Sequence, residues 1–147
     1  MIDRREAILD RLVAVTGGLD VVEKAVRNVS FITESARPAV IIYDSDEAAE
    51  ESDSPGRPAA SPRRVIMSPE LHLLLAGRPD DAGSRLNAMR VAIIKAVIND
   101  ATLQEIVTTN GWIRYDGCIS DFGDGRALEG RMRVGFSFLY FVIQKEL

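Results

Sequence analysis

The sequence predicts a single α+β domain, because three of its properties agree. Its 147 residues suffice for one domain with a core and are too few for two ordinary domains. Hydrophobic residues make up 46% and charged residues 27% of the chain, close to globular averages, which argues against a disordered or fibrous protein. Apolar residues follow helical spacing in two long segments, residues 3–16 and 84–99, and alternate at the C-terminal end of the chain.

The N-terminal part begins with a predicted amphipathic helix over residues 3–16. Its apolar side chains are spaced for one face, and Asp3 and Glu6 are placed as a capping pair. The glycine pair that follows is expected to end this helix. Residues 19–31 leave two possibilities open, since their spacing fits a helix while their valine content favours a strand.

A short apolar strand and an acidic segment come next. Residues 38–43, Pro-Ala-Val-Ile-Ile-Tyr, form a β-branched run that predicts a strand buried on both faces. Residues 44–62 contain three prolines and little to bury, so we expect a long mobile loop there. The acidic residues of this loop are Asp44, Asp46, Glu47, Glu50, Glu51 and Asp53.

The position of this acidic loop changes the meaning of the net charge. The whole chain carries −4, but the residues outside the loop carry a small positive balance. That balance is too small to indicate a dedicated nucleic-acid surface. The acidity is therefore a local feature of one segment.

The middle of the chain predicts a strand and then two helices. Residues 65–76 are β-like around Pro69, which predicts one strand with a break, since proline cannot donate to a ladder. A turn over residues 77–83 leads to the clearest helical pattern, residues 84–99, with one apolar stripe. A capping-box sequence at Thr102 is expected to start a second, short helix.

The C-terminal third predicts two strands, residues 112–119 and 131–143, joined by a glycine-rich loop. Every second residue from Met132 to Val142 is large and apolar, so this face of the last strand is expected to lie beneath the helices. The opposite face begins polar and turns apolar, which indicates contact with something else, such as an oligomer partner. The apolar residues there are Leu139, Phe141 and Ile143.

Few residues are available for catalysis or metal binding. With one cysteine, Cys118, and one histidine, His72, the chain has neither an internal disulfide nor an ordinary zinc site. Asp44 and Asp46 follow a strand, as do the two carboxylates of magnesium-dependent phosphotransferases of the haloacid dehalogenase type, which gives the alternative function. The threonine expected after the second carboxylate is Ala48. No cofactor or metal is predicted.

No apolar run reaches the roughly 18 residues that a membrane span needs. The N-terminus carries no apolar segment of the signal-peptide type. We therefore expect a soluble protein that is assembled in the bacterial cytoplasm and has no membrane partner.

Taken in order, these segments resemble the lambda-type tail terminator family of long-tailed phages, also called minor tail protein U. The resemblance covers most of the chain, and its strongest element is strand 38–43 followed by Asp-Ser-Asp-Glu, where Ser45 stands in place of the family's glycine. It implies a mostly antiparallel β-sheet with two to three helices packed on one face. The other segments that carry it are the helix over residues 4–15, Val26-Arg27-Asn28, the helix over residues 86–97 followed by Asp100 and Leu103, and the aromatic final strand.

The same resemblance implies a structural virion protein and not an enzyme. It implies a hexameric ring at the head-proximal end of the tail, which stops tube polymerisation and provides the head-joining surface. The partners would be further copies of the chain, the major tail tube protein and the head–tail connector, with DNA passing only transiently through the lumen. Another head–tail connector or tail-completion protein of the same particle is the alternative role.

A ring subunit needs two different surfaces that complement each other. The acidic loop and a set of arginines supply charges of opposite sign, and we predict that they make subunit or tail-tube contacts. The candidate residues are Asp44, Asp46, Glu47, Glu50, Glu51, Arg63, Arg64, Arg126, Arg131 and Arg133.

Overall fold

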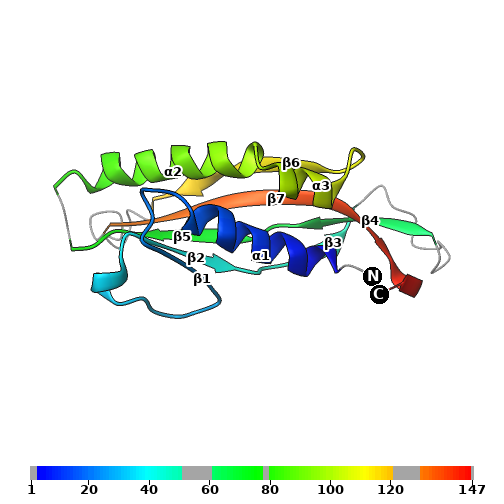
Figure 1. The fold of residues 1–147 in the computed structure, drawn as a ribbon, viewed down its shortest axis with the longest axis horizontal. Helices are drawn as coiled ribbons and strands as arrows, with labels where there is room; N and C mark the ends of the chain where they lie inside the picture. The colour runs from blue at the N-terminus through cyan, green and yellow to red at the C-terminus, as the bar shows by residue number, and fades with distance from the viewer. Residues whose placement is uncertain (1–2, 51–60, 78–79, 121–129, 147) are drawn as a thin grey trace.

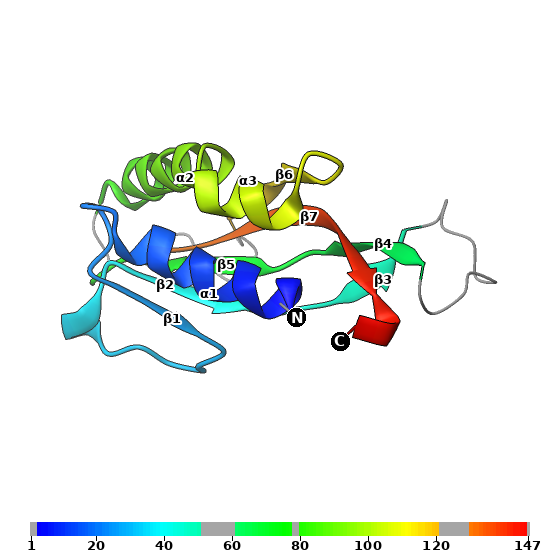
Figure 2. The same ribbon diagram turned by 45° about the vertical axis from the view of Figure 1, so that its right-hand side comes forward.

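The computed structural model describes residues 3–50, 61–77, 80–120 and 130–146. In these residues three α-helices lie over one face of a seven-stranded sheet (Figures 1 and 2). The helices are α1 (Arg4–Gly17), α2 (Ala82–Ile98) and α3 (Ala101–Val107). The strands are β1 (Lys24–Arg27), β2 (Ala39–Tyr43), β3 (Glu47–Ala49), β4 (Pro62–Met67), β5 (Glu70–Leu74), β6 (Trp112–Ile119) and β7 (Arg131–Ile143). Short 3-10 helices span Glu34–Ala36 and Gln144–Glu146.

The predicted fold class is confirmed. Of the strand pairs described, β1 with β2 is parallel and the others are antiparallel. The bounds of β6 and β7 are those that the sequence predicts. Within the described ranges, no helix has the length and apolar character to cross a membrane.

The long strand β7 organises the sheet. It pairs with β6 along one edge and with both β4 and β5 along the other. Met67 pairs with Phe138 and Glu70 pairs with Gly135, so β4 and β5 keep one register and form a single line with a gap at residues 68–69. The predicted strand with a break at Pro69 is therefore confirmed, because proline has no N–H for the ladder.

Strands β2 and β3 form the next line, and they are offset where they meet. The last pair of β2 with β5 is Tyr43 with Glu70, and the first pair of β3 with β4 is Glu47 with Met67. Three residues, 44–46, therefore lie opposite two, 68–69, which makes a one-residue β-bulge. Ser45 has a φ of 55°, in the left-handed region that favours glycine. A glycine at this position, as in the family that the sequence resembles, adopts this conformation without strain.

The expectation of a loop throughout residues 44–62 is corrected here. Residues Glu47–Ala49 form β3, and Pro62 begins β4, because the backbones of these segments pair with each other. Their composition hides this pairing, since acidic and alanine side chains are weak strand formers. Residues 51–60 of the expected loop lie outside the described residues.

The main core lies between the sheet and the helices. Its largest fully buried side chains on β7 are Phe136, Phe138 and Tyr140, which pack with apolar residues of all three helices. Burial of each such side chain stabilises the fold by about 1.5–3 kcal/mol. The face of β7 that the sequence predicts to lie beneath the helices does lie beneath them.

A smaller cluster lies on the opposite face of the sheet and covers only β1, β2 and β5. Ile32 packs there against Ala39 and Ile41 of β2 and Leu74 of β5. Strand β2 is consequently buried on both faces, as predicted. For residues 19–31 the sequence leaves helix and strand open. In the structure Lys24–Arg27 of this segment form strand β1, which lies at the sheet edge parallel to β2.

The helix ends agree with the sequence at α1 and differ at α3. The Asp3 carboxylate accepts a hydrogen bond from the Glu6 N–H at 3.2 Å. At α3, the prediction that Thr102 begins the helix is wrong, because Asp100 is the N-cap and accepts from the Leu103 N–H at 2.9 Å. The same carboxylate accepts two bonds from Arg11 at 2.7 and 2.9 Å, which ties α1 to the start of α3.

Candidate functional site

The bulge between β2 and β3 is held by a cluster of charged side chains. The Arg27 guanidinium on β1 donates to Asp44 at 2.9 Å, to Glu6 at 2.7 Å and to Asp10 at 3.0 Å. The bonds to Glu6 and Asp44 raise the pKa of Arg27, and Arg27 holds the pKa of Asp44 below its usual value. The cluster joins α1, β1 and the end of β2.

Backbone and hydroxyl groups complete this arrangement. The Asn28 side-chain oxygen accepts from the Asp44 N–H at 3.1 Å, and Arg5 donates to the Ser45 carbonyl at 2.8 Å. The buried Tyr140 hydroxyl donates to the Glu47 carboxylate. Burial raises the pKa of Tyr140, and the bond to Glu47 raises it further. Two of the predicted contact residues, Asp44 and Glu47, are therefore bound within the chain.

This geometry does not support the magnesium-dependent alternative. The Asp44 carboxylate turns toward α1 and pairs with Arg27, whereas Asp46 lines a hollow on the sheet face away from the helices. The two carboxylates therefore do not converge on one ion. In the ranges that the structure describes, no group of three or more His, Cys, Asp or Glu side chains is placed to hold a metal.

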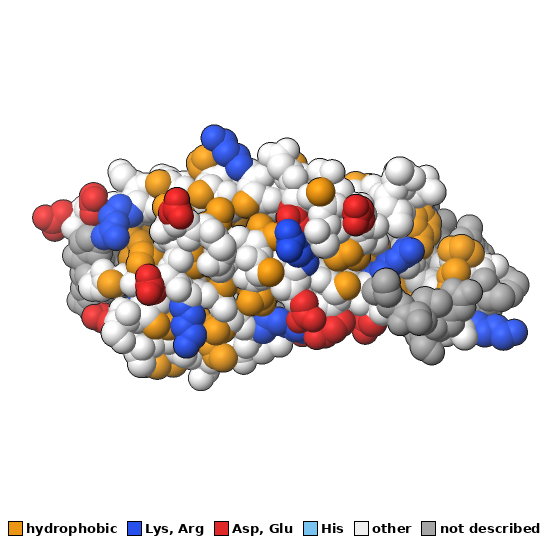
Figure 3. All heavy atoms as spheres, viewed as in Figure 1, with side chains coloured by type: hydrophobic (Ala, Val, Ile, Leu, Met, Phe, Trp, Pro, Cys, Tyr) orange, Lys and Arg blue, Asp and Glu red, His pale blue; other side chains and the backbone are white. Residues whose placement is uncertain are grey.

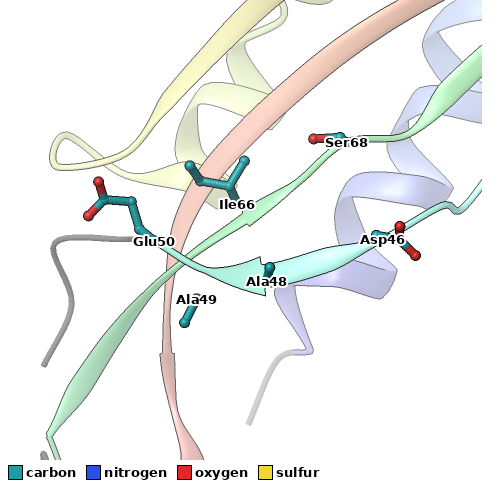
Figure 4. A pocket seen from close by; sticks show the side chains of 6 residues that line it. All are labelled: Asp46, Ala48, Ala49, Glu50, Ile66 and Ser68. Carbon is teal, nitrogen blue, oxygen red and sulfur yellow. The ribbon is translucent and has the colours of Figure 1, made fainter. Parts of the chain in front are cut away.

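The hollow beside Asp46 lies at the β3–β4 end of the sheet and has a volume of about 400 Å³ (Figure 4). The Asp46 side chain is exposed, and Glu50 lies at the other end of the hollow. Small and apolar side chains lie between these two acids. The lining residues are Asp46, Ala48, Ala49, Glu50, Ile66 and Ser68.

An apolar row crosses the same face of the sheet. Ala48, Ile66, Leu139 and Trp112 are successive partners across β3, β4, β7 and β6. The Arg114 guanidinium lies 4.6 Å from the centre of the Trp112 ring. Leu139 is only 1% exposed, so this part of the face that was expected to meet a partner is already covered within the chain.

The predicted arginines do not gather around the acidic segment. The Arg64 Nε lies 3.9 Å from the Glu50 carboxylate, whereas Arg133 lies 3.9 Å from Glu70 on a different part of the sheet. The other predicted arginines and acids are distributed as follows: Arg63 on β4, Arg131 opposite Leu74, and Glu51 and Arg126 outside the described residues.

His72 lies on β5 and is partly buried. Its ring packs edge-on against Tyr43, with 4.7 Å between the ring centres, and its Nε2 lies 3.3 Å from Glu70. Burial lowers the pKa of His72, which favours the neutral ring. No nucleophilic side chain is bonded to it among the described residues, so it shows no catalytic arrangement.

Sequence reasoning missed two charged features. Arg27 was seen only as part of the family resemblance, although it binds three carboxylates from distant segments. The basic residues of α2 are missed because the prediction for residues 84–99 rests on its apolar stripe alone. A search for unpaired charge along that helix would have found them, because α2 contains no acidic residue at all.

Comparisons with known proteins show a likeness of fold. No protein-family model matches the sequence, and no curated protein matches it. A solved structure that matches is the sheath/tube terminator of an extracellular contractile injection system, PVC, in its extended state. The two share 14% sequence identity with a TM-score of 0.56, over 97% of this chain and 56% of that one. This chain therefore spans about half the length of that terminator and shares its fold.

Proposed function

We propose that this protein is a tail terminator, a ring that caps the tail tube of a phage or phage-like particle and stops its polymerisation. The observation that supports this most is the likeness of 97% of the chain to a sheath/tube terminator. The resemblance of the sequence to lambda-type terminators is a separate observation that leads to the same role. It adds a hexameric ring and a head-joining surface to the proposal.

The side chains of the chain suit a structural role better than a catalytic one. Of the two carboxylates that the sequence offers as catalytic, Asp44 is bound to Arg27, and Asp46 lies apart from it in the hollow. The acidic hollow at Asp46 and the β6 edge are surfaces on which other proteins can dock. The proposed partners are further copies of the chain, the major tail tube protein and the head–tail connector, with DNA only passing through the lumen.

The alternative within the same particle is a head–tail connector or tail-completion protein. Both roles place the protein at the head-proximal end of the tail, but they differ in what happens when it is missing. Without a terminator the tube grows to uncontrolled lengths, whereas without a connector it keeps its normal length and fails to join heads.

Deletion of the gene from a strain that produces the particle separates these roles. We expect tails of broadly distributed, excessive length by negative-stain electron microscopy, with normal lengths restored when the gene is supplied in trans. Normal-length tails without heads would instead support the connector role. Normal particles would remove both.

A further inference from the structure

Helix α2 presents a basic surface to solvent. Its 17 residues include Arg85, Arg90 and Lys95 and no acidic residue. Arg90 is used within the chain, where it donates to the Tyr115 hydroxyl at 3.2 Å. Arg85 and Lys95 are exposed and form no ion pair with any described residue, and Val91 between them is 41% exposed. The α2 face, defined as Arg85, Ala88, Val91 and Lys95, is therefore basic with an apolar centre.

The two aspartates before α2 do not neutralise this face. Asp81 is the N-cap residue, and Asp80 precedes it. Neither forms an ion pair with Arg85 among the described residues. Figure 3 shows the side of the molecule that carries the helices, where acidic and basic side chains are scattered among apolar ones and some lie side by side. The charge of the α2 face is thus available to another molecule.

The hollow beside Asp46 has the complementary character. Its acidic groups are Asp46 and Glu50, of which Glu50 already lies 3.9 Å from the Arg64 Nε, and its apolar surface comes from Ala48 and Ile66. The Asp46 carboxylate is exposed and makes no hydrogen bond or ion pair with any described residue. A long basic side chain fits such a site, since its stem covers apolar surface while its charged end meets the carboxylate.

These two surfaces cannot meet within one molecule. Helix α2 lies over the helix-covered face of the sheet, while the hollow is on the opposite face at the β3–β4 end (Figures 1 and 2). Both views place α2 and β3 at opposite ends of the molecule. A pair of different, complementary surfaces on opposite sides produces head-to-tail association, which closes into a ring when the rotation between copies permits it.

We propose that the α2 face of one copy docks into the Asp46 hollow of the next copy. This inference rests on the proposed ring function and names its contact. Arg85 and Lys95 approach Asp46 and Glu50, and Val91 covers the apolar side chains between them. Opposite charges at the two surfaces also set the direction of assembly, since like surfaces repel each other.

Charge exchange between the two surfaces tests this contact. The hollow variant is Asp46→Arg with Glu50→Gln, and the helix variant is Arg85→Glu with Lys95→Glu. Each variant alone places like charges together and is expected to raise the concentration for half-assembly about tenfold or more, as the loss of one charge pair would. The combined variant, with all four substitutions, places Arg at position 46 opposite acidic side chains and leaves no acid in the hollow to repel them, so it is expected to assemble at nearly the wild-type concentration.

The measurement is sedimentation velocity of the purified full chain over a range of concentrations. Asp20→Arg and Lys24→Glu are the matched controls, because both residues are exposed and far along the chain from either surface. Circular dichroism melting of every variant confirms folding. The controls are expected to assemble as the wild type does.

The other outcomes each count against the contact. If the wild type assembles and the two variants assemble equally well, the ring stands and this contact is wrong. The contact is also wrong if both variants fail and the combination fails with them while remaining folded. If the wild type stays monomeric at all concentrations, alone and with tail tubes, the ring function itself is contradicted and this inference with it.

Discussion

The bulge cluster around Arg27 and the α2 face carry charge in opposite ways. At the bulge, Arg27 binds three carboxylates, and two further polar contacts hold the neighbouring backbone. On α2, Arg85 and Lys95 have no ion-pair partner among the described residues. Charges that are paired inside one chain stabilise its fold, whereas unpaired charges on a helix face are available for recognition. The acidic segment therefore divides into structural residues, such as Asp44, and exposed ones, such as Asp46.

The largest stability effect is expected at Arg27. Replacement by alanine leaves Glu6, Asp10 and Asp44 close together without a cation, so the free energy of unfolding should fall by about 1.5–3 kcal/mol. Urea unfolding followed by circular dichroism measures this loss. Lys24→Ala on the same strand is the control and should change stability by no more than about 0.5 kcal/mol. Equal losses in the two variants would contradict the structural role of the cluster.

Asp44→Asn is expected to have a smaller effect that depends on pH. The pKa of Asp44 in the folded chain lies below its ordinary value of 3.8, so its ion pair stabilises the fold above that pH. We expect the variant to lose about 1–2 kcal/mol at pH 7. The difference from wild type should shrink as the pH falls through the folded pKa, where the wild-type carboxyl is protonated. A difference that is the same at pH 7 and pH 3 would show that the charge is not its source.

Tyr140→Phe removes one hydroxyl and leaves the buried ring in place. Loss of the bond to Glu47 should lower the free energy of unfolding by about 0.5–1.5 kcal/mol. A double-mutant cycle with Glu47→Ala isolates that bond, because alanine has no acceptor for the hydroxyl. The double variant should be scarcely less stable than either single one, whereas fully additive losses would mean that the two groups act independently.

The smallest stability effect is expected on α2, where association should change instead. Glu at position 85 lies near the helix N-terminus and is favoured there by the helix dipole, while Glu at position 95 is disfavoured near the C-terminus. The net change in the variant with Arg85→Glu and Lys95→Glu should stay within about 1 kcal/mol. A loss as large as that of Arg27→Ala would show that these residues hold the fold and are not available for contacts.

Much of the fold follows from apolar periodicity in the sequence. The alternation from Met132 to Val142 predicts both β7 and its buried face, and the Pro69 break is expected from the chemistry of proline. Strand β3 is harder to predict, because its three residues have exposed side chains and gain their place only by pairing with β4. A strand whose position depends only on backbone pairing with its partner has no pattern of apolar residues in its own sequence that would predict it.

The candidate site is less predictable than the fold, for a related reason. The sequence identifies acidic residues 44–54 as a group, but their roles depend on which face of the β2–β3 line each side chain occupies. Asp44 faces Arg27, a residue distant in the sequence, while Asp46 is two residues away and beyond the bulge. Pairing between distant segments decides which charges are free. The composition of one segment cannot show which of its charges are paired.

Tail-tube polymerisation in the presence of the purified protein tests the proposed function most directly. Tube subunits from the same particle are allowed to grow, the protein is added, and tube lengths are measured by electron microscopy. We predict that growth stops and that a ring is visible at one end of each tube. Tubes that continue to lengthen as in its absence, with bare ends, would contradict the role of tail terminator.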